Sequence, residues 1–331
     1  MIYQNKIQAS IILLLKNGEK YIEEVLDAIF SQQFYGKYEV ICIDSGSTDR
    51  TLDIVKKYNV KLTMIRSQEF NHGETRNLGA QLADIKSSFL VYLSQDATPA
   101  NKYWLQNLIN PMLEDSQVAG CFSRHVPRKG TSPALIRQLT QNWQTGGKEQ
   151  LVKQIPSMHE YLQNRFFYNF FSNTSSAIRK CIWLNTPFKT VSFAEDALWA
   201  EEVLVKGYKI VFEPSSVVIH SHDYPLMEQF RQNFDHSYAM KKLFNPTDYN
   251  KLIYWIRSFL VIPIHVWQDW VFIYKSESCK QLLTHQKVYY QFHSIGWHIS
   301  SVVGAFIGAN YEKLPQSLRI LFSRQETLRR K

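Results

Sequence analysis

The stretch Phe-Leu-Val-Tyr-Leu-Ser-Gln-Asp-Ala-Thr-Pro, residues 89–99, decides how the rest of the chain is interpreted. Its five apolar residues predict a strand that is buried on both faces and ends in polar residues before a proline. Asp96 is therefore expected at the carboxyl end of a central strand. Ligands of open α/β sheets bind at that edge, so Asp96 is a candidate for holding a cation or a polar ligand. The competing interpretation is that Asp96 caps a helix that begins near Pro99.

The residues before this stretch alternate between two kinds of pattern. Apolar runs predict strands at 9–15, 38–43 and 61–66, and helical spacing of apolar residues predicts helices at 22–30 and 50–58. This order is typical of an α/β fold with a mostly parallel, doubly wound sheet and helices on both faces.

Polar residues at the ends of these strands are candidates for ligand binding. Asp44 and Ser45 leave the second strand at the same edge as Asp96, and Asp44 is suited to accept hydrogen bonds from a nucleobase. A helix that begins near Gly73 brings free backbone N–H groups to this edge, and Arg76 adds a positive charge. Together they suit a diphosphate. The alternative for Arg76 is an ion pair with a surface carboxylate.

Two acids and a histidine follow much later in the chain. A helical pattern over 193–208 ends at Gly207 and places Glu195 and Asp196 at its N-terminus. Interaction with the helix dipole is a sufficient structural reason for one acid at this position, so the second acid is a candidate for a catalytic role. A short strand is then predicted over 217–219, and His220 follows it directly.

Length and charge suggest two domains with different partners. The 331 residues exceed what one core usually covers, and we expect domains at 1–225 and 226–331. Residues 226–331 hold fourteen Lys and Arg against seven Asp and Glu, which predicts an anionic surface as partner. Lipid is favoured over nucleic acid, because the basic residues are interleaved with large apolar groups and no recognition motif occurs.

The last third predicts helices. Residues 252–274 are apolar, but their polar side chains and Pro263 argue against a membrane span, so we expect a helix pair packed on the first domain or lying at a bilayer surface. Residues 314–331 mix apolar and basic side chains, which suits an interfacial basic helix or the solvated end of a core helix. Residues 127–158 are polar and predict a mobile loop or a helical lid.

The cysteines and the N-terminus indicate the compartment. Four widely separated cysteines predict neither a zinc site nor a disulfide framework, and the first apolar run is too short for a signal sequence. We therefore expect a cytoplasmic protein, with peripheral attachment to the plasma membrane through the C-terminal region.

Taken together, the motifs resemble those of the family-2 glycosyltransferases of the GT-A fold, over about residues 8–224. The motifs that carry the resemblance are the turn 44–49, Asp96, the pair Glu195 and Asp196, and His220, 24 residues beyond Asp196. The segments that resemble the bacterial rhamnosyltransferase branch are 70–73 with 75–77, 95–97 and 220–222.

The resemblance implies an inverting transfer of a sugar, L-rhamnose from dTDP-rhamnose, to a hydroxyl of a glycan or lipid-linked acceptor in bacterial surface polysaccharide synthesis. It implies that Asp196 is the general base, because an acceptor hydroxyl is a poor nucleophile until a carboxylate takes its proton. Glu195 and Trp199 are expected on the acceptor side. The residues expected to bind the donor are Asp44, Ser45, Asn71, His72, Gly73, Arg76, Asn77, Gln95, Asp96 and Arg124.

The resemblance also implies a divalent ion, Mg²⁺ or Mn²⁺, held by Asp96 with His220 or His222. One departure bears on this site. Many family members have Asp-x-Asp where this chain has Ser94-Gln95-Asp96, so a single carboxylate remains. Two alternatives stay open: a family-2 transferase that uses another nucleotide sugar, and a non-catalytic nucleotide-sugar-binding subunit.

Overall fold

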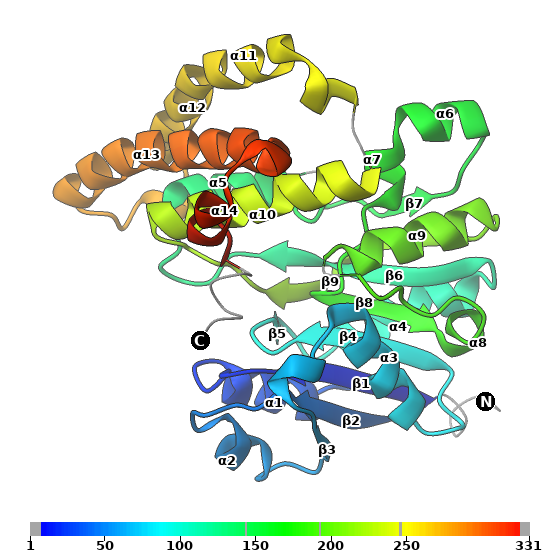
Figure 1. Ribbon diagram of the computed structural model, residues 1–331. Helices are drawn as coiled ribbons and strands as arrows, with labels where there is room; N and C mark the ends of the chain where they lie inside the picture. Colours follow the sequence, from blue (N-terminus) through cyan, green and yellow to red (C-terminus); the bar gives the residue numbers. More distant parts are fainter. Residues whose placement is uncertain (1–7, 143, 192, 245–246, 325–331) are drawn as a thin grey trace. The chain divides into compact units, whose positions relative to one another are not determined.

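The computed structural model describes residues 8–142, 144–191, 193–244 and 247–324 (Figure 1). The chain divides into two units. The first comprises Met1–Arg128 and Leu139–His220, and the second comprises Lys129–Gln138 and Ser221–Lys331. The segment Lys129–Gln138, which the sequence suggested for the first domain, thus belongs with the C-terminal helices.

The first unit is built on a mixed sheet, nine-stranded within the described residues, in the order β3-β2-β1-β4-β8-β6-β9-β5, with β7 paired to β9. The strands are β1 (Gln8–Leu15), β2 (Lys37–Asp44), β3 (Lys61–Met64), β4 (Phe89–Ser94), β5 (Thr98–Pro99), β6 (Val118–Val126), β7 (Leu151–Lys153), β8 (Ser175–Arg179) and β9 (Lys209–Ile219). Strands β1 to β4 pair in parallel, whereas β8 runs antiparallel between β4 and β6. The expected α/β class is confirmed.

Helices cover both faces of this sheet. Those of the first unit are α1 (Ile22–Phe30), α2 (Thr51–Val55), α3 (His72–Leu82), α4 (Trp104–Glu114), α6 (Met158–Gln163), α7 (Arg165–Asn169), α8 (Lys180–Trp183) and α9 (Glu195–Val205). Successive residues of β1 point to opposite faces: Ile11 and Leu13 pack with α1 and α4, and Ile12 packs with α3 and α9. Burial of each such side chain contributes roughly 1.5–3 kcal/mol, which fixes the central strands in place.

Three local expectations need correction. Thr98 and Pro99 form the short strand β5, which pairs with Ile219 and Val218 of β9, so Asp96 does not cap a helix that begins at Pro99. Strand β9 starts at Lys209, well before the predicted 217–219. The polar segment 127–158 contains a helix, α5 (Pro133–Gln141), and the strand β7.

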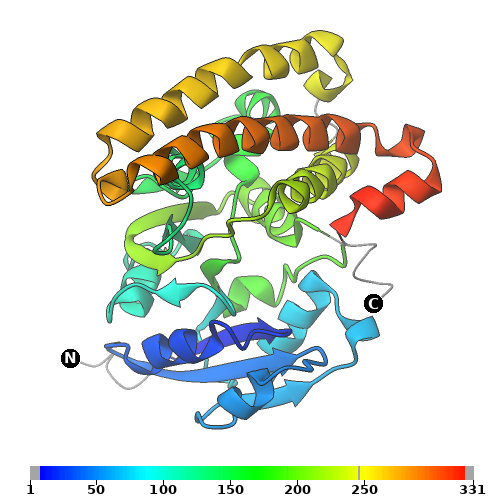
Figure 2. The same cartoon turned by 90° about the vertical axis from the view of Figure 1, so that its left-hand side faces the viewer.

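The second unit is helical. Its helices are α10 (Leu226–Phe244), α11 (Leu252–Leu260), α12 (Ile262–Lys275), α13 (Thr284–Ala309) and α14 (Gln316–Phe322). Helix α13 packs against α10 and also against α11 and α12, which run alongside it in Figures 1 and 2. Gly304 and Gly308 allow the close approach of α13 to α10, because a Cβ at either position would overlap the carbonyl oxygen of Phe230 or Phe234.

The helix pair expected at 252–274 is present, and the break falls at Val261, one residue before α12 begins. Among the described residues, no helix combines the length and apolar character needed to cross a bilayer.

Two basic residues of the C-terminal tail make contacts within the second unit. Arg319 donates to the carbonyl oxygens of Leu314 and Glu312, and Arg324 donates to Gln232 of α10. These two cations are therefore used within the second unit. Residues 325–331, which hold the remaining basic residues of the tail, lie outside the described residues.

Candidate functional site

A cavity of about 230 Å³ opens at the carboxyl ends of β1 and β4. Sheet order reverses between these two strands, since β2 and β3 continue outward from β1 while later strands continue from β4. This is where ligands of α/β sheets bind. The cavity is lined by Ile12, Leu14, Leu15, Lys16, Phe70, His72, Arg76, Tyr92, Leu93, Ser94, Gln95, Asp96 and Asn173.

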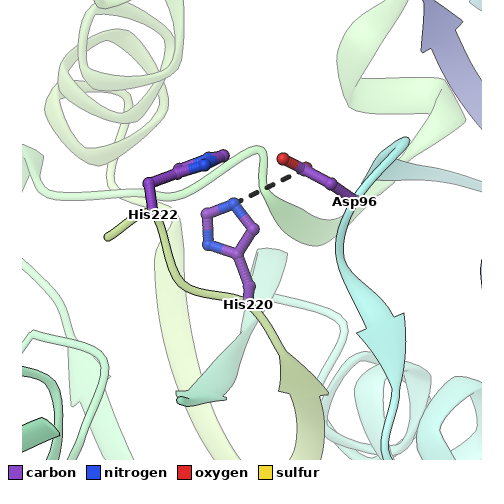
Figure 3. A group of neighbouring side chains, drawn as sticks. All are labelled: Asp96, His220 and His222. Carbon is purple, nitrogen blue, oxygen red and sulfur yellow. Dashed lines mark ion pairs between the residues drawn. The ribbon is translucent and has the colours of Figure 1, made fainter. Parts of the chain in front are cut away.

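Asp96 and His220 meet at one end of the site. Because β5 pairs with β9, with Thr98 opposite Ile219, the residues that flank these strands come together. His220 Nε2 lies 3.6 Å from Asp96 Oδ1 (Figure 3). A carboxylate oxygen and an imidazole nitrogen are ligands that suit Mn²⁺, so these two residues fit the expected metal. His222 follows two residues later in the chain and belongs to the second unit.

Arg128 fixes the backbone at Asp96. Its guanidinium donates to the Asp96 carbonyl oxygen at 2.7 Å and to Thr98 Oγ1 at 2.8 Å, and it lies 4.0 Å from the ring centroid of Tyr21. The same guanidinium pairs with Glu24 at 3.0 Å. Arg128 was not foreseen from the sequence, because nothing in its neighbourhood marks it as different from other loop cations.

His125 and Arg124 lie on β6. The ring of His125 is 5.7 Å from that of His220, and burial together with the charge of His220 lowers the pKa of His125 to about 3. His125 is therefore neutral at physiological pH and adds no charge beside His220. Arg124, expected to bind the donor, has its Nε buried and does not line the cavity, so its role stays a prediction.

The acid pair expected at the start of a helix is found there. Glu195 and Asp196 begin α9, directly after Ala194, whose φ of 61° turns the chain sharply into the helix. Asn173 lines the cavity and contacts both acids: its side chain donates to Glu195 at 3.3 Å and its backbone N–H donates to Asp196 at 3.4 Å. The pair thus lies directly behind a wall of the cavity.

The two acids differ in electrostatic environment. Burial and the negative charge of Glu195 raise the pKa of the Asp196 carboxyl to about 7. Burial also disfavours ionisation of Glu195, but Arg76 and His72 hold its pKa below the ordinary value. At neutral pH, Glu195 is ionised and Asp196 can both accept and release a proton, which is the behaviour of a general base.

Arg76 is paired rather than free for a diphosphate. Its Nη1 donates to Glu195 Oε1 at 2.6 Å, and both side chains are nearly buried. This carboxylate is internal, unlike the surface carboxylate of the alternative interpretation. Arg76 nevertheless lines the cavity, and its Nε has no hydrogen-bond partner among the described residues, so contact with a donor stays a prediction.

The N-terminus of α3 corrects another expectation. Asn71 caps this helix, and its side chain accepts hydrogen bonds from the backbone N–H groups of Gly73 and Glu74. These groups are therefore not free to bind a diphosphate. Asn77 is also structural, because its amide bonds to the backbone of Phe188 and to the indole of Trp183.

The turn after β2 is held by hydrogen bonds among its own residues. Asp44 is fully buried, and its carboxylate accepts hydrogen bonds from the backbone N–H groups of Gly46 and Ser47 and from the Ser47 hydroxyl. Ser45 donates to the Leu15 carbonyl oxygen. The structure gives both residues a local role, and their contact with a nucleobase stays a prediction.

Gln95 and Lys16 join the ends of β4 and β1. The Gln95 amide accepts from the Lys16 backbone N–H and donates to its carbonyl oxygen, each at 2.9 Å. Lys16 Nζ in turn donates to the carbonyl oxygens of Ser45 and Gly46 and to the Ser67 hydroxyl. Lys16 was missed by the sequence analysis, although a cation directly after the first strand is a usable signal for this edge.

Trp199 does not reach an acceptor. Its indole is 1% exposed and packs between the rings of Phe171 and Phe188 in the core. The expectation of an acceptor contact is therefore wrong, since its apolar ring is needed to fill the space beneath α9. Asn173, which contacts both acids from the cavity wall, is a site residue that the sequence did not single out.

Comparison with known sequences identifies the family of the chain. The family model described as Glycosyl transferase family 2 matches residues 10–174. The O-antigen chain rhamnosyltransferase WbaN of Salmonella anatum is 32% identical over 209 residues, which cover 62% of this chain and 64% of that protein. The O-antigen chain rhamnosyltransferase RfbN of Salmonella typhimurium is 30% identical over 233 residues, which cover 69% of this chain and 71% of that protein. The match thus spans slightly less than two thirds of the first relative.

Comparison with solved structures shows the fold. The chain is similar to a mannosyltransferase, PcManGT from Pyrobaculum calidifontis in complex with GDP-Man and Mn²⁺, with a TM-score of 0.56 at 16% identity over 92% of this chain and 86% of that chain. It is also similar to Staphylococcus aureus TarS 1–349, with a TM-score of 0.51 at 16% identity over 93% of this chain and 91% of that chain. The expected GT-A type of fold, with C-terminal helices, is confirmed.

Proposed function

Because the chain belongs to glycosyl transferase family 2, we propose that it transfers a sugar from a nucleoside diphosphate donor to an acceptor hydroxyl with inversion. The sugar we propose is L-rhamnose from dTDP-rhamnose, since both Salmonella relatives are described as O-antigen chain rhamnosyltransferases. The acceptor is then a glycan or lipid-linked glycan of a surface polysaccharide, and the reaction takes place in the cytoplasm.

The observation that carries this proposal is the position of Asp196. Its carboxyl has a pKa of about 7, and the cavity-lining Asn173 contacts it. We propose that Asp196 accepts the proton of the acceptor hydroxyl as the new C–O bond forms, a role that typically contributes a factor of 10²–10⁴ in rate. Inversion follows from a single displacement, in which the acceptor attacks opposite the departing diphosphate.

Glu195 and Arg76 are assigned supporting roles. The charge of ionised Glu195 helps to raise the pKa of Asp196 and so makes its carboxylate a stronger base, and the Arg76 guanidinium holds Glu195 in its charged form. Arg76 also lines the cavity, so its charge helps to stabilise the negative charge that develops on a departing diphosphate.

We propose that Asp96 and His220 hold the divalent ion, with His222 as a further ligand. A bound Mg²⁺ or Mn²⁺ would neutralise charge on the diphosphate. The chain's own contribution is to fix the two ligands: Arg128 holds the backbone of Asp96, and the pairing of β5 with β9 fixes His220 beside it. Isothermal calorimetry with Mn²⁺ tests the site. Asp96→Asn is expected to abolish binding, and His285→Asn on α13 is the matched control that leaves it unchanged. Equal binding by Asp96→Asn would overturn the assignment.

A donor screen tests the proposed reaction. Purified protein is incubated with single nucleotide sugars and a lipid-linked glycan acceptor, and free nucleoside diphosphate is measured. We expect release from dTDP-rhamnose at a rate at least tenfold above that from UDP-GlcNAc or GDP-mannose. Faster release from another donor would retain the transferase and reject rhamnose. Binding of dTDP without release of any diphosphate would favour the non-catalytic alternative.

A further inference from the structure

The outer face of α11 and α12 carries a row of exposed apolar side chains. Their spacing of three, four or seven residues follows the turns of a helix, so they lie on one side. Each is between 43% and 69% exposed. We call this row the outer stripe, and its members are Ile253, Ile256, Leu260, Ile264, Trp267 and Tyr274.

The opposite face of the same helices is buried, and a paired carboxylate fixes its orientation. Trp255, Val266 and Ile273 are buried on that side. Asp269 lies between them in the sequence and is completely buried, where its carboxylate accepts from Arg137 Nε at 2.5 Å and contacts His298 Nε2 at 2.8 Å. A buried carboxylate with two such partners resists rotation of α12, because a turned helix would leave the charge unpaired. The outer stripe is therefore held away from the interior of the second unit.

The exposed charged residues within α11 and α12 are of one sign, and the acids that flank these helices, Asp248 and Glu277, pair with Lys251 and Lys280. Within α11 and α12 the charged residues are Arg257, Asp269 and Lys275, and the single acid is the buried one. Lys287, on the neighbouring α13, lies 5.4 Å from the ring centroid of Tyr274 and adds a third cation near the end of the stripe. The exposed face thus combines apolar and aromatic side chains with cations.

The apolar, aromatic and positively charged side chains of this face favour an anionic bilayer over a second copy of the chain as the partner that covers it. A second copy of the chain would bring Arg257 and Lys275 against the same residues of its partner with no exposed acid on either helix to balance them. An anionic bilayer offers negative headgroups to the cations, acyl chains to the aliphatic residues, and a boundary region that Trp and Tyr favour.

We propose that the outer stripe docks this protein onto an anionic lipid bilayer, with α11 and α12 lying in the plane of the interface. Membrane attachment is thus assigned to these helices. The inference goes beyond the proposed function and does not depend on it, since docking requires neither donor nor acceptor.

Vesicle sedimentation tests the proposal. The full-length protein is mixed with vesicles of phosphatidylcholine alone or with one third phosphatidylglycerol, and the bound fraction is measured. We expect binding to the anionic vesicles, and a loss of about tenfold or more in affinity for the double variant Leu260→Ser with Trp267→Ser. The matched control is Ile85→Ser in the first unit, where an isoleucine that is 92% exposed is replaced without effect on binding. Circular dichroism verifies that each variant is folded.

A variant that removes two cations separates the electrostatic contribution to vesicle binding from the apolar contribution. Arg257→Gln with Lys275→Gln is expected to lower affinity for anionic vesicles about tenfold and to leave binding to neutral vesicles unchanged. Equal binding by wild type and the stripe variant would overturn the proposal. So would light scattering that shows a dimer for wild type and a monomer for the stripe variant, because a second copy would then cover the stripe. Diphosphate release with a water-soluble acceptor stays at the wild-type rate in all these variants, so failure of docking and failure of catalysis are distinguishable.

Discussion

At the scale of single residues, the site depends on two adjacent acids that behave differently. Arg76 pairs directly with Glu195, whereas the ionised form of Asp196 is stabilised by the backbone N–H groups of Asn173 and Ala197 and by the charge of Arg76, which together do not offset burial and the charge of Glu195. Neighbouring carboxylates with separated pKa values are a common way to provide a proton acceptor near neutral pH.

This arrangement predicts the pH dependence of turnover. Asp196 must be ionised to act as a base, so kcat/KM is expected to rise about tenfold per pH unit below pH 7 and to level off above it. Glu195→Gln removes the negative charge that raises the pKa of Asp196, so the rising limb should move to lower pH. The measurement is the pH profile of diphosphate release for both proteins. A limb that stays in place, or moves to higher pH, would contradict the pairing described here.

Lys153 is a buried cation outside the site. Its side chain is 1% exposed, donates to the carbonyl oxygens of Phe167 and Phe170, and has a pKa lowered to about 7 by burial. In the unfolded chain the same group titrates near 10.4, so between these values the unfolded state binds a proton that the folded state lacks. The folded state is therefore stabilised as pH rises through this window.

Replacement of Lys153 should remove that dependence. Between pH 7 and pH 9 the free energy of unfolding of wild type is expected to gain about 2 kcal/mol relative to Lys153→Met, measured by urea denaturation. Lys148→Met, at an exposed position, is the control that should follow wild type. Parallel pH profiles for wild type and Lys153→Met would show that Lys153 is not the titrating group.

At the scale of elements, the contact between α10 and α13 depends on backbone proximity. Gly304→Ala places a methyl group against the carbonyl oxygen of Phe230, and we expect the free energy of unfolding to fall by roughly 1–3 kcal/mol. Phe292→Ala on the same helix, at a position that is 70% exposed, should change it by less than about 0.5 kcal/mol. Equal effects of the two substitutions would mean that α13 and α10 are not in close contact.

The sequence predicted elements well where one pattern dominated. Residues 22–30 form α1 with the predicted bounds, and the apolar run 89–93 forms β4. It failed where pairing with a distant strand decides the structure, as for Thr98 and Pro99, which join the sheet only because β9 lies beside them. The capping of Gly73 by Asn71 was also missed, although an Asn two residues before a helical Gly is a known capping signal.

At the scale of the whole molecule, strand order brings together residues that the sequence separates. Asp96 and His220 are 124 positions apart, yet β5 and β9 place them within 3.6 Å. The sequence could nominate both because each follows a strand. It could not show that Asn173 connects the cavity to the acid pair, or that Lys129–Gln138 belongs to the second unit, because both depend on tertiary packing.

The turnover of Asp196→Asn tests whether Asp196 is the base of a sugar transfer. Diphosphate release from dTDP-rhamnose with acceptor is measured at saturating donor, and dTDP binding is measured by calorimetry in the same preparations. We expect kcat to fall roughly 100- to 10,000-fold while the Kd for dTDP changes less than about threefold. Near-normal kcat in the variant would contradict that role.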